Sequence, residues 1–279
     1  MGHGIAQVLA VGGYEVRLCD LDAERVDAAL VKVRANLEGG VKRGKLEADQ
    51  LEPILLRLTA SSDSNAALEG ATLLIEAIPE NLELKKRVLA DATAQNPGLA
   101  LIGTNTSSLP VTEIAQATST PERVVGLHFF NPVHISKLLE IVTGERTSEE
   151  TLALALEVAE RIGKTPIVVR DAPGFASSRL GLVLGLEAIR MLETGVASAE
   201  DIDRALELGY RHPMGPLKTT DYVGLDVRLA IAEHLHAEIG EGFRPPLLLR
   251  RLVRAGKLGR KSGEGFYRWD ESGKCLGPA

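Results

Sequence analysis

The chain has few cysteines, no long apolar run and no excess of positive charge. Its 279 residues include two cysteines, too few for a disulfide framework, and we expect Cys19, in an apolar strand-like run, to be a small core residue. The formal net charge of −6 argues against nucleic acid or an anionic membrane surface as the main partner. No segment has the pattern of a membrane span or of an N-terminal signal. These absences predict a soluble, reduced, cytoplasmic protein.

The signatures of several common enzyme classes are also absent. The sequence contains no G-x-S-x-G, no Walker motif and no cluster of Cys and His. His234 and His236 lie two residues apart in a helical pattern, so they point to different faces and make a poor metal pair. The sequence therefore supports no hydrolase, NTPase or metal site.

Residues 1–171 alternate between strand-like and helix-like patterns. Amphipathic stretches such as 22–38 and 82–94 separate short apolar runs at 15–20, 58–63, 72–78, 100–105, 124–130, 138–142 and 166–170. This alternation is typical of βαβ units and predicts a Rossmann-type, mostly parallel sheet. The segment 171–174 contains Pro and Gly and marks a boundary. Residues 172–279 follow with apolar positions at helical spacing and are predicted to form an all-α domain.

The segment 104–142 carries the parts of an acid–base site. It has hydroxyl side chains at 106–108, His128 in one apolar run and Glu140 in another. Buried ionisable groups usually need partners, and the simplest partner for each of these two is the other. An imidazole, a carboxylate to orient it and a hydroxyl to hold a substrate oxygen can move a proton. The alternative is a core histidine near an unrelated ion pair.

These runs resemble the L-3-hydroxyacyl-CoA dehydrogenase family, and the resemblance covers essentially the whole chain. The matching motifs, in the family's order, are IEAIPENLELKK (75–86), TNTSSLP (104–110), GLHFFNPV (126–133), LLEIV (138–142), DAPGF (171–175), GYRHPMGPLKTTDYVGLD (209–226) and GRKSGEGFYRW (259–269). The resemblance implies interconversion of a (3S)-3-hydroxyacyl-CoA and a 3-ketoacyl-CoA with NAD. It also implies a short acyl chain such as 3-hydroxybutyryl-CoA and a place in fatty-acid or butanoate metabolism.

The resemblance assigns catalytic roles to His128, Glu140 and Ser107. His128 would be the base, because an imidazole can take up a proton near neutral pH and return it in the reverse reaction. Glu140 would hold the other ring nitrogen, and Ser107 would hydrogen-bond the substrate oxygen. Asn131 would anchor the nicotinamide or the substrate, although it is equally typical of a turn before Pro132.

The same resemblance assigns five residues to the dinucleotide. Asp20 ends the first visible strand, where a carboxylate accepts ribose hydroxyls and repels a 2′-phosphate, which favours NAD over NADP. Asp20 could instead cap the next helix. Gly2 matches the third glycine of G-x-G-x-x-G. Glu80, Lys85 and Asn105 match further contacts beyond strand ends, although Lys85 is also typical of a helix surface.

The N-terminus aligns with the end of the glycine motif. By this alignment the first strand and two glycines would lie about 10–12 residues upstream, and in the Rossmann order 3-2-1-4-5-6 that strand is central. We therefore expect the strands at 15–20 and 72–78 to face a gap. We also expect either an upstream start in the natural gene product or impaired NAD binding by this chain.

Substrate contacts are expected at Lys42, Arg43 and Ser178. The first two follow a helix where the family grips the phosphates of coenzyme A, although a solvated helix face is the default for such a pair. Ser178 stands where the family usually has Asn in PGFxxNR, and its single hydroxyl could still contact the substrate. The helical domain should also mediate a homodimer.

Two other functions fit the same motifs. A related dehydrogenase of the same superfamily could act on a sugar acid, which would not need the Lys42-Arg43 grip. A non-catalytic, crystallin-like structural or binding relative would account for the truncated glycine motif and for Ser178.

Overall fold

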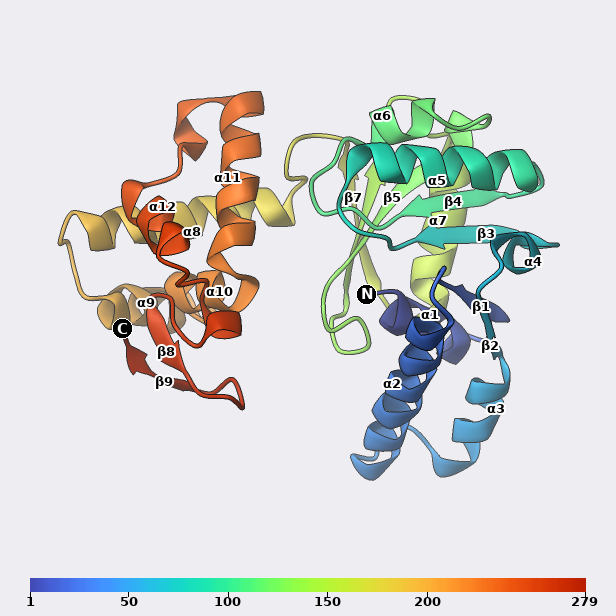
Figure 1. Ribbon diagram of the computed structural model, residues 1–279, viewed down its shortest axis with the longest axis horizontal. Helices are drawn as coiled ribbons and strands as arrows, with labels where there is room; N and C mark the ends of the chain where they lie inside the picture. The colour runs from blue at the N-terminus through green and yellow to red at the C-terminus, as the bar shows by residue number, and fades with distance from the viewer. The chain divides into compact units, whose positions relative to one another are not determined.

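The computed structural model describes residues 1–279 as two compact units, Met1–Ala172 and Pro173–Ala279 (Figure 1). The division lies one residue beyond the boundary expected at 171/172. Within these units, no helix is both long enough and apolar enough to span a membrane.

The first unit contains the seven strands that the sequence predicts. One parallel pair consists of β1 (Val16–Cys19) and β2 (Leu58–Ser61). A second sheet has the order β3-β4-β5-β6-β7, with strands Leu73–Glu76, Leu101–Thr104, Val124–Phe129, Leu138–Thr143 and Thr165–Arg170. Every neighbouring pair is parallel except β5 and β6. The expected mostly parallel sheet is therefore confirmed.

The sheet is interrupted between β1 and β3, as the sequence predicts. Neither strand has a hydrogen-bonded neighbour on the side facing the gap. The apolar run Leu73–Ile75 in β3 is only half-buried, whereas the same positions of β4 are fully buried. Burial alternates along β1 and leaves Cys19 exposed. The expectation that Cys19 lies in the core is therefore wrong, because its strand has only one covered face.

Seven α-helices and two short 3-10 helices connect or flank these strands. The α-helices are α1 (Gly2–Val11), α2 (Ala23–Lys42), α3 (Leu51–Leu56), α4 (Ser64–Leu68), α5 (Leu82–Gln95), α6 (Val111–Gln116) and α7 (Glu149–Arg161), and the 3-10 helices are η1 (Ala48–Gln50) and η2 (Pro121–Arg123). Side chains from α1 and α7 share one apolar core with β4, β5 and β6. Asp22 caps α2 by accepting from the backbone N–H groups of Glu24 and Arg25. The cap is therefore Asp22, and Asp20 does not fill that role.

The second unit is helical with a small hairpin at its end. It contains α8 (Ser177–Glu193), α9 (Ala199–Gly209), α10 (Pro216–Val223), α11 (Leu225–Ile239), η3 (Glu241–Phe243), α12 (Leu247–Arg254), η4 (Arg260–Ser262), β8 (Tyr267–Trp269) and β9 (Cys275–Pro278). The helical character is confirmed, and the antiparallel β8–β9 pair is an addition that the sequence did not indicate.

Buried Asp221 of α10 holds this hairpin in place. Its carboxylate accepts hydrogen bonds from the backbone N–H groups of Phe266 and Tyr267, both at 2.9 Å, and from the Trp269 indole at 2.8 Å. Gly265 packs so closely on Asp221 that an added Cβ would lie 2.2 Å from the carboxylate. Burial raises the pKa of Asp221, and the three N–H donors oppose that rise.

Candidate active site

His128 and Glu140 lie opposite each other on the antiparallel strands β5 and β6. Opposed residues of such a pair have side chains on the same face, so the register brings the two groups together. The Nδ1 atom of His128 lies 2.7 Å from Oε2 of Glu140. The two residues are 6% and 0% exposed. The pairing inferred from the sequence is therefore present in the structure.

This pair is shielded from water. Glu140 is fully buried, and the centroid of the His128 ring lies 4.5 Å from that of Phe130. A carboxylate in such surroundings interacts strongly with a nearby cation, because little water screens it. Glu140 can therefore fix the proton on Nδ1 and stabilise a protonated ring. Proton exchange with a substrate then falls to Nε2.

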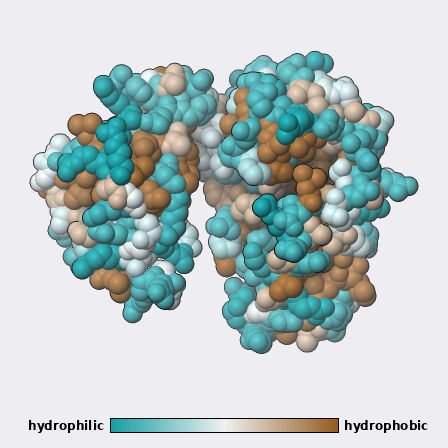
Figure 2. All heavy atoms as spheres, viewed as in Figure 1, coloured by the Kyte–Doolittle hydropathy of each residue, from teal (hydrophilic) through white to brown (hydrophobic).

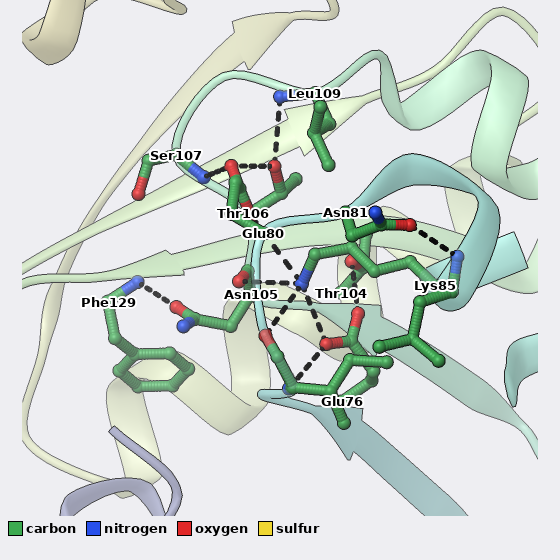
Figure 3. A network of polar contacts seen from close by, with 12 residues as sticks. Glu76, Glu80, Asn81, Lys85, Thr104, Asn105, Thr106, Ser107, Leu109 and Phe129 are labelled. Atoms are coloured by element: carbon green, nitrogen blue, oxygen red, sulfur yellow. Dashed lines mark hydrogen bonds and ion pairs between the residues drawn. The ribbon is translucent and has the colours of Figure 1, made fainter. Parts of the chain in front are cut away.

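Glu80 organises the loop that carries Ser107 (Figure 3). Its Oε1 atom accepts from the Thr106 hydroxyl at 2.7 Å and from the backbone N–H groups of Ser107 and Ser108 at 2.9 and 3.2 Å. The Ser107 side chain is directed away from this network and its residue is exposed. A fixed backbone with an outward hydroxyl suits a residue that hydrogen-bonds a ligand oxygen. In this structure the contacts of Glu80 are with its own chain.

Lys85 is buried, and its ammonium group is hydrogen-bonded to other groups of the first unit. It is 0% exposed, and its ammonium lies 2.7 Å from Glu76. It also donates to the carbonyls of Ile78 and Asn105, both at 3.3 Å (Figure 3). Lys85 is thus neither a helix-surface residue nor available for a direct cofactor contact, and both expectations need correction. Its contacts instead fix the chain after β3 and after β4.

The sequence analysis missed Glu76 and Thr104, which complete this network. Glu76 is buried at the end of β3, and its second oxygen accepts from the Thr104 hydroxyl at 2.7 Å. The available signal was a carboxylate inside the apolar run TLLIEAI, the same kind of signal that drew attention to Glu140. Lys85, nine residues later, supplies the buried countercharge.

Asn105 and Asn131 lie at the ends of neighbouring strands. The Asn105 side-chain oxygen accepts from the backbone N–H of Phe129 at 2.9 Å, so it fixes the chain next to His128. Asn131 is exposed and precedes a cis peptide bond to Pro132. The following loop is held by Lys164, another residue that the sequence analysis missed, which donates to the carbonyls of Val133 and Ser136.

The proposed dinucleotide residues Gly2 and Asp20 fit an NAD molecule. Gly2 opens α1, whose first turn has no acidic residue and no side-chain cap, so its N-terminus can accept an anion. Asp20 follows β1 and is exposed, and its carboxylate accepts one weak bond, from the backbone N–H of Asp22 at 3.3 Å. An exposed carboxylate at this position can accept ribose hydroxyls.

The proposed substrate residues lie in separate parts of the chain. Lys42 ends α2 and Arg43 follows it, and both are exposed without a carboxylate within ion-pair distance. The Arg43 guanidinium lies over Gly39, where an added Cβ would be 3.1 Å away. Ser178 is half-buried in the first turn of α8 in the second unit.

A mostly parallel α/β unit with a buried His–Glu pair at neighbouring strands, followed by a helical unit, defines a dinucleotide-dependent dehydrogenase. The model of the NAD-binding domain of 3-hydroxyacyl-CoA dehydrogenase matches residues 1–172, and that of its C-terminal domain matches residues 174–269. The chain belongs to the 3-hydroxyacyl-CoA dehydrogenase family, and it is an NAD-dependent enzyme of that family. The sugar-acid and crystallin-like alternatives are thereby set aside.

Individual relatives agree with this assignment. A probable 3-hydroxybutyryl-CoA dehydrogenase of Bacillus subtilis is 43% identical over 97% of this chain and 94% of its own length. A 3-hydroxyadipyl-CoA dehydrogenase of Escherichia coli is 42% identical over 96% of this chain and 57% of its own length. The crystal structure of a (S)-3-hydroxybutyryl-CoA dehydrogenase from Ralstonia eutropha has a TM-score of 0.93 at 37% identity, covering 97% of this chain and 96% of that one.

Proposed function

We propose that the enzyme interconverts short-chain (3S)-3-hydroxyacyl-CoA and 3-ketoacyl-CoA, with 3-hydroxybutyryl-CoA and acetoacetyl-CoA as the reference pair, in fatty-acid or butanoate metabolism. The observation that carries the chemistry is the buried contact of 2.7 Å between His128 and Glu140. The short chain length is supported by similarity to relatives named for 3-hydroxybutyryl-CoA.

In the oxidation, His128 removes the proton of the 3-hydroxyl group through Nε2. NAD, when bound, supplies the acceptor for the hydride that leaves C3. Glu140 already holds Nδ1 and offsets the positive charge that the ring acquires, so little reorganisation accompanies the transfer. In the reduction, the protonated ring returns the proton to the oxygen. Ser107 donates a hydrogen bond to that same oxygen.

The loop network positions Ser107 for this role. Glu80 holds the backbone N–H groups of Ser107 and Ser108, and Lys85 lies 3.6 Å from the other oxygen of Glu80. Lys85 in turn is fixed by Glu76. We infer that Lys85 and Glu76 are positioning residues, which act on the reaction through the geometry of Glu80 and the Ser107 loop.

Cofactor and coenzyme A contacts complete the proposal. Asp20 would accept the adenosine ribose hydroxyls, Gly2 would lie beside the pyrophosphate, and Asn105 would approach the nicotinamide half. Exposed Lys42 and Arg43 would bind the phosphates of coenzyme A, because neither has a carboxylate partner in the chain. Asn131 and Ser178 would contact the substrate.

A chain-length series tests the proposed substrate class. The enzyme is assayed for NADH oxidation with acetoacetyl-CoA, 3-ketohexanoyl-CoA and 3-ketodecanoyl-CoA. We expect acetoacetyl-CoA to be reduced with a kcat/KM at least equal to that for 3-ketodecanoyl-CoA. A clear preference for the ten-carbon substrate would refute the short-chain assignment, and no turnover of any of the three would refute the reaction.

We also propose that the second unit forms a homodimer. Large apolar side chains remain exposed on its helices, and Figure 2 shows hydrophobic residues on its visible surface among hydrophilic ones. Those on α8, α10 and α11 are Leu180, Val183, Leu184, Tyr222, Val223, Val227 and Ile239. Exposed apolar surface on several helices of one unit is typical of a subunit contact.

A further inference from the structure

His134 of the first unit lies in a loop whose backbone is fixed on both sides of it. The buried ammonium of Lys164 donates to the carbonyls of Val133 and Ser136, so one side chain holds the chain just before and just after the histidine. Val133 also packs on the first turn of α1, where a Cβ added to Gly4 would lie 2.9 Å from the Cβ of Val133. The position of His134 beside α1 is therefore set by the chain around it.

The charged groups that act on the His134 ring are all positive. The ring is half-buried and takes part in no hydrogen bond or ion pair within the chain. Burial lowers the pKa of His134, and the charges of Arg43 and Lys164 lower it further. Burial also lowers the pKa of His3 in the first turn of α1, with Lys32 and His134 among the positive groups that add to the effect. Cationic groups of α1, the end of α2 and the segment before β7 thus meet at this loop.

Such an arrangement favours a ligand with several negative charges. Like charges that approach one another raise the free energy of the folded chain, and an anion between them removes that cost. The Arg43 guanidinium is available for such a ligand, because the residue is exposed and has no carboxylate within ion-pair distance. A protonated imidazole and a guanidinium both donate N–H groups to phosphate oxygens. His134 lies within electrostatic range of Arg43, a residue already proposed as a contact for coenzyme A.

We propose that His134 binds a phosphate group of coenzyme A together with Arg43, and that this contact makes the affinity for acyl-CoA depend on pH. Without the ligand, the surrounding cations keep the ring mostly neutral at pH 7. A phosphate beside the ring supplies the missing countercharge and raises the pKa of His134, so that binding takes up a proton. The affinity should therefore be higher at pH 6 than at pH 8. This inference rests on the proposed function, and it adds a residue to the coenzyme A site of that function.

The first test separates the coenzyme from the acyl group. The KM of the wild-type enzyme is measured at pH 6 and pH 8 for acetoacetyl-CoA and for acetoacetyl-pantetheine, which has the same reacting thioester and no phosphate. One charge-assisted hydrogen bond at a half-buried site predicts that the ratio of the pantetheine KM to the coenzyme A KM is roughly 3- to 10-fold larger at pH 6.

The two levels of the argument give different results in this assay. If acetoacetyl-CoA is reduced and the ratio of the two KM values is the same at both pH values, this inference fails and the proposed function stands. If neither thioester is reduced, the proposed function fails, and this inference fails with it.

Variants then assign the effect to one ring. His134→Gln keeps an N–H donor but cannot ionise, so at pH 6 it should raise the KM for acetoacetyl-CoA by roughly 3- to 10-fold and leave kcat unchanged. The KM for acetoacetyl-pantetheine should stay the same, and the ratio should no longer depend on pH. An equal rise in KM for both thioesters would show that His134 only supports its loop, and would overturn the assignment.

Lys137→Gln is the matched control, because it removes an exposed positive charge three residues later in the same segment. It should leave the ratio and its pH dependence unchanged. The same loss of pH dependence in Lys137→Gln would mean that the general positive charge of this surface, and not the His134 ring, is responsible. If His134→Gln does not fold, the wild-type comparison at the two pH values decides.

Discussion

Replacing Glu140 with Gln should slow the reaction without disturbing the fold around it. The side chain keeps its shape, but the carboxylate at 2.7 Å from Nδ1 of His128 becomes an amide in a position that is 0% exposed. A hydrogen bond to a charged group contributes about 1.5–3 kcal/mol, which corresponds to roughly a 10- to 150-fold effect on a step that protonates the ring. An amide can also donate to Nδ1, which would stabilise the wrong tautomer. The two effects together predict a fall in kcat of about 10²–10⁴.

The pH profile gives this prediction a second readout. Reduction of acetoacetyl-CoA requires the protonated ring, and the loss of Glu140 weakens its hold on the proton. The pH midpoint above which reduction is lost should therefore lie lower in Glu140→Gln than in the wild-type enzyme. A residue with a purely structural role would lower the rate without moving this midpoint.

The assay follows NADH oxidation from pH 5 to 9, with the dissociation constant for NADH and the thermal midpoint measured in parallel. Glu145→Gln is the matched control, because Glu145 is an exposed carboxylate just beyond β6. A Glu140→Gln enzyme with the wild-type kcat and the wild-type pH midpoint would refute the reasoning.

Three further predictions concern the cofactor, the second unit and its assembly. Asp20→Ala should weaken NAD binding and reduce discrimination against NADP, measured by titration with both cofactors, whereas a wild-type preference for NADPH would contradict the assignment. Asp221→Asn should lower the free energy of unfolding by about 1–3 kcal/mol in urea titrations, because an amide cannot accept all three N–H groups that the carboxylate holds. An unchanged unfolding midpoint would argue against that network. Sedimentation at micromolar concentration should show a dimer, and replacement of exposed Leu184 by Glu should shift it toward monomer. A wild-type monomer would exclude the proposed dimer.

The strands and the acid–base pair were predictable because both depend on strong local patterns. An apolar run shorter than a helix is typical of a buried strand, and a charged residue within such a run stands out, as His128 and Glu140 do. Their mutual contact followed from the cost of burying either group alone, and the antiparallel register of β5 and β6 realises it.

The polar network and the hairpin were missed because they depend on contacts between distant segments. Lys85 lies in an ordinary amphipathic pattern, and nothing local indicates that its ammonium is buried against Glu76. The β8–β9 hairpin is short and is fixed by Asp221, far earlier in the chain. Arg228 of α11 also follows a normal helical pattern, so the burial of its Nε atom without a hydrogen-bond acceptor is visible only once the neighbouring helices are in place.

The central claim is that the buried imidazole of His128 exchanges the substrate proton in NAD-dependent 3-hydroxyacyl-CoA chemistry. The most direct test compares the rate of NADH oxidation with acetoacetyl-CoA in the wild-type enzyme and in His128→Ala, at equal and saturating NADH. The account predicts turnover by the wild type, a loss of about 10²–10⁴ in the variant, and unchanged NADH affinity. A wild-type rate in His128→Ala would contradict it.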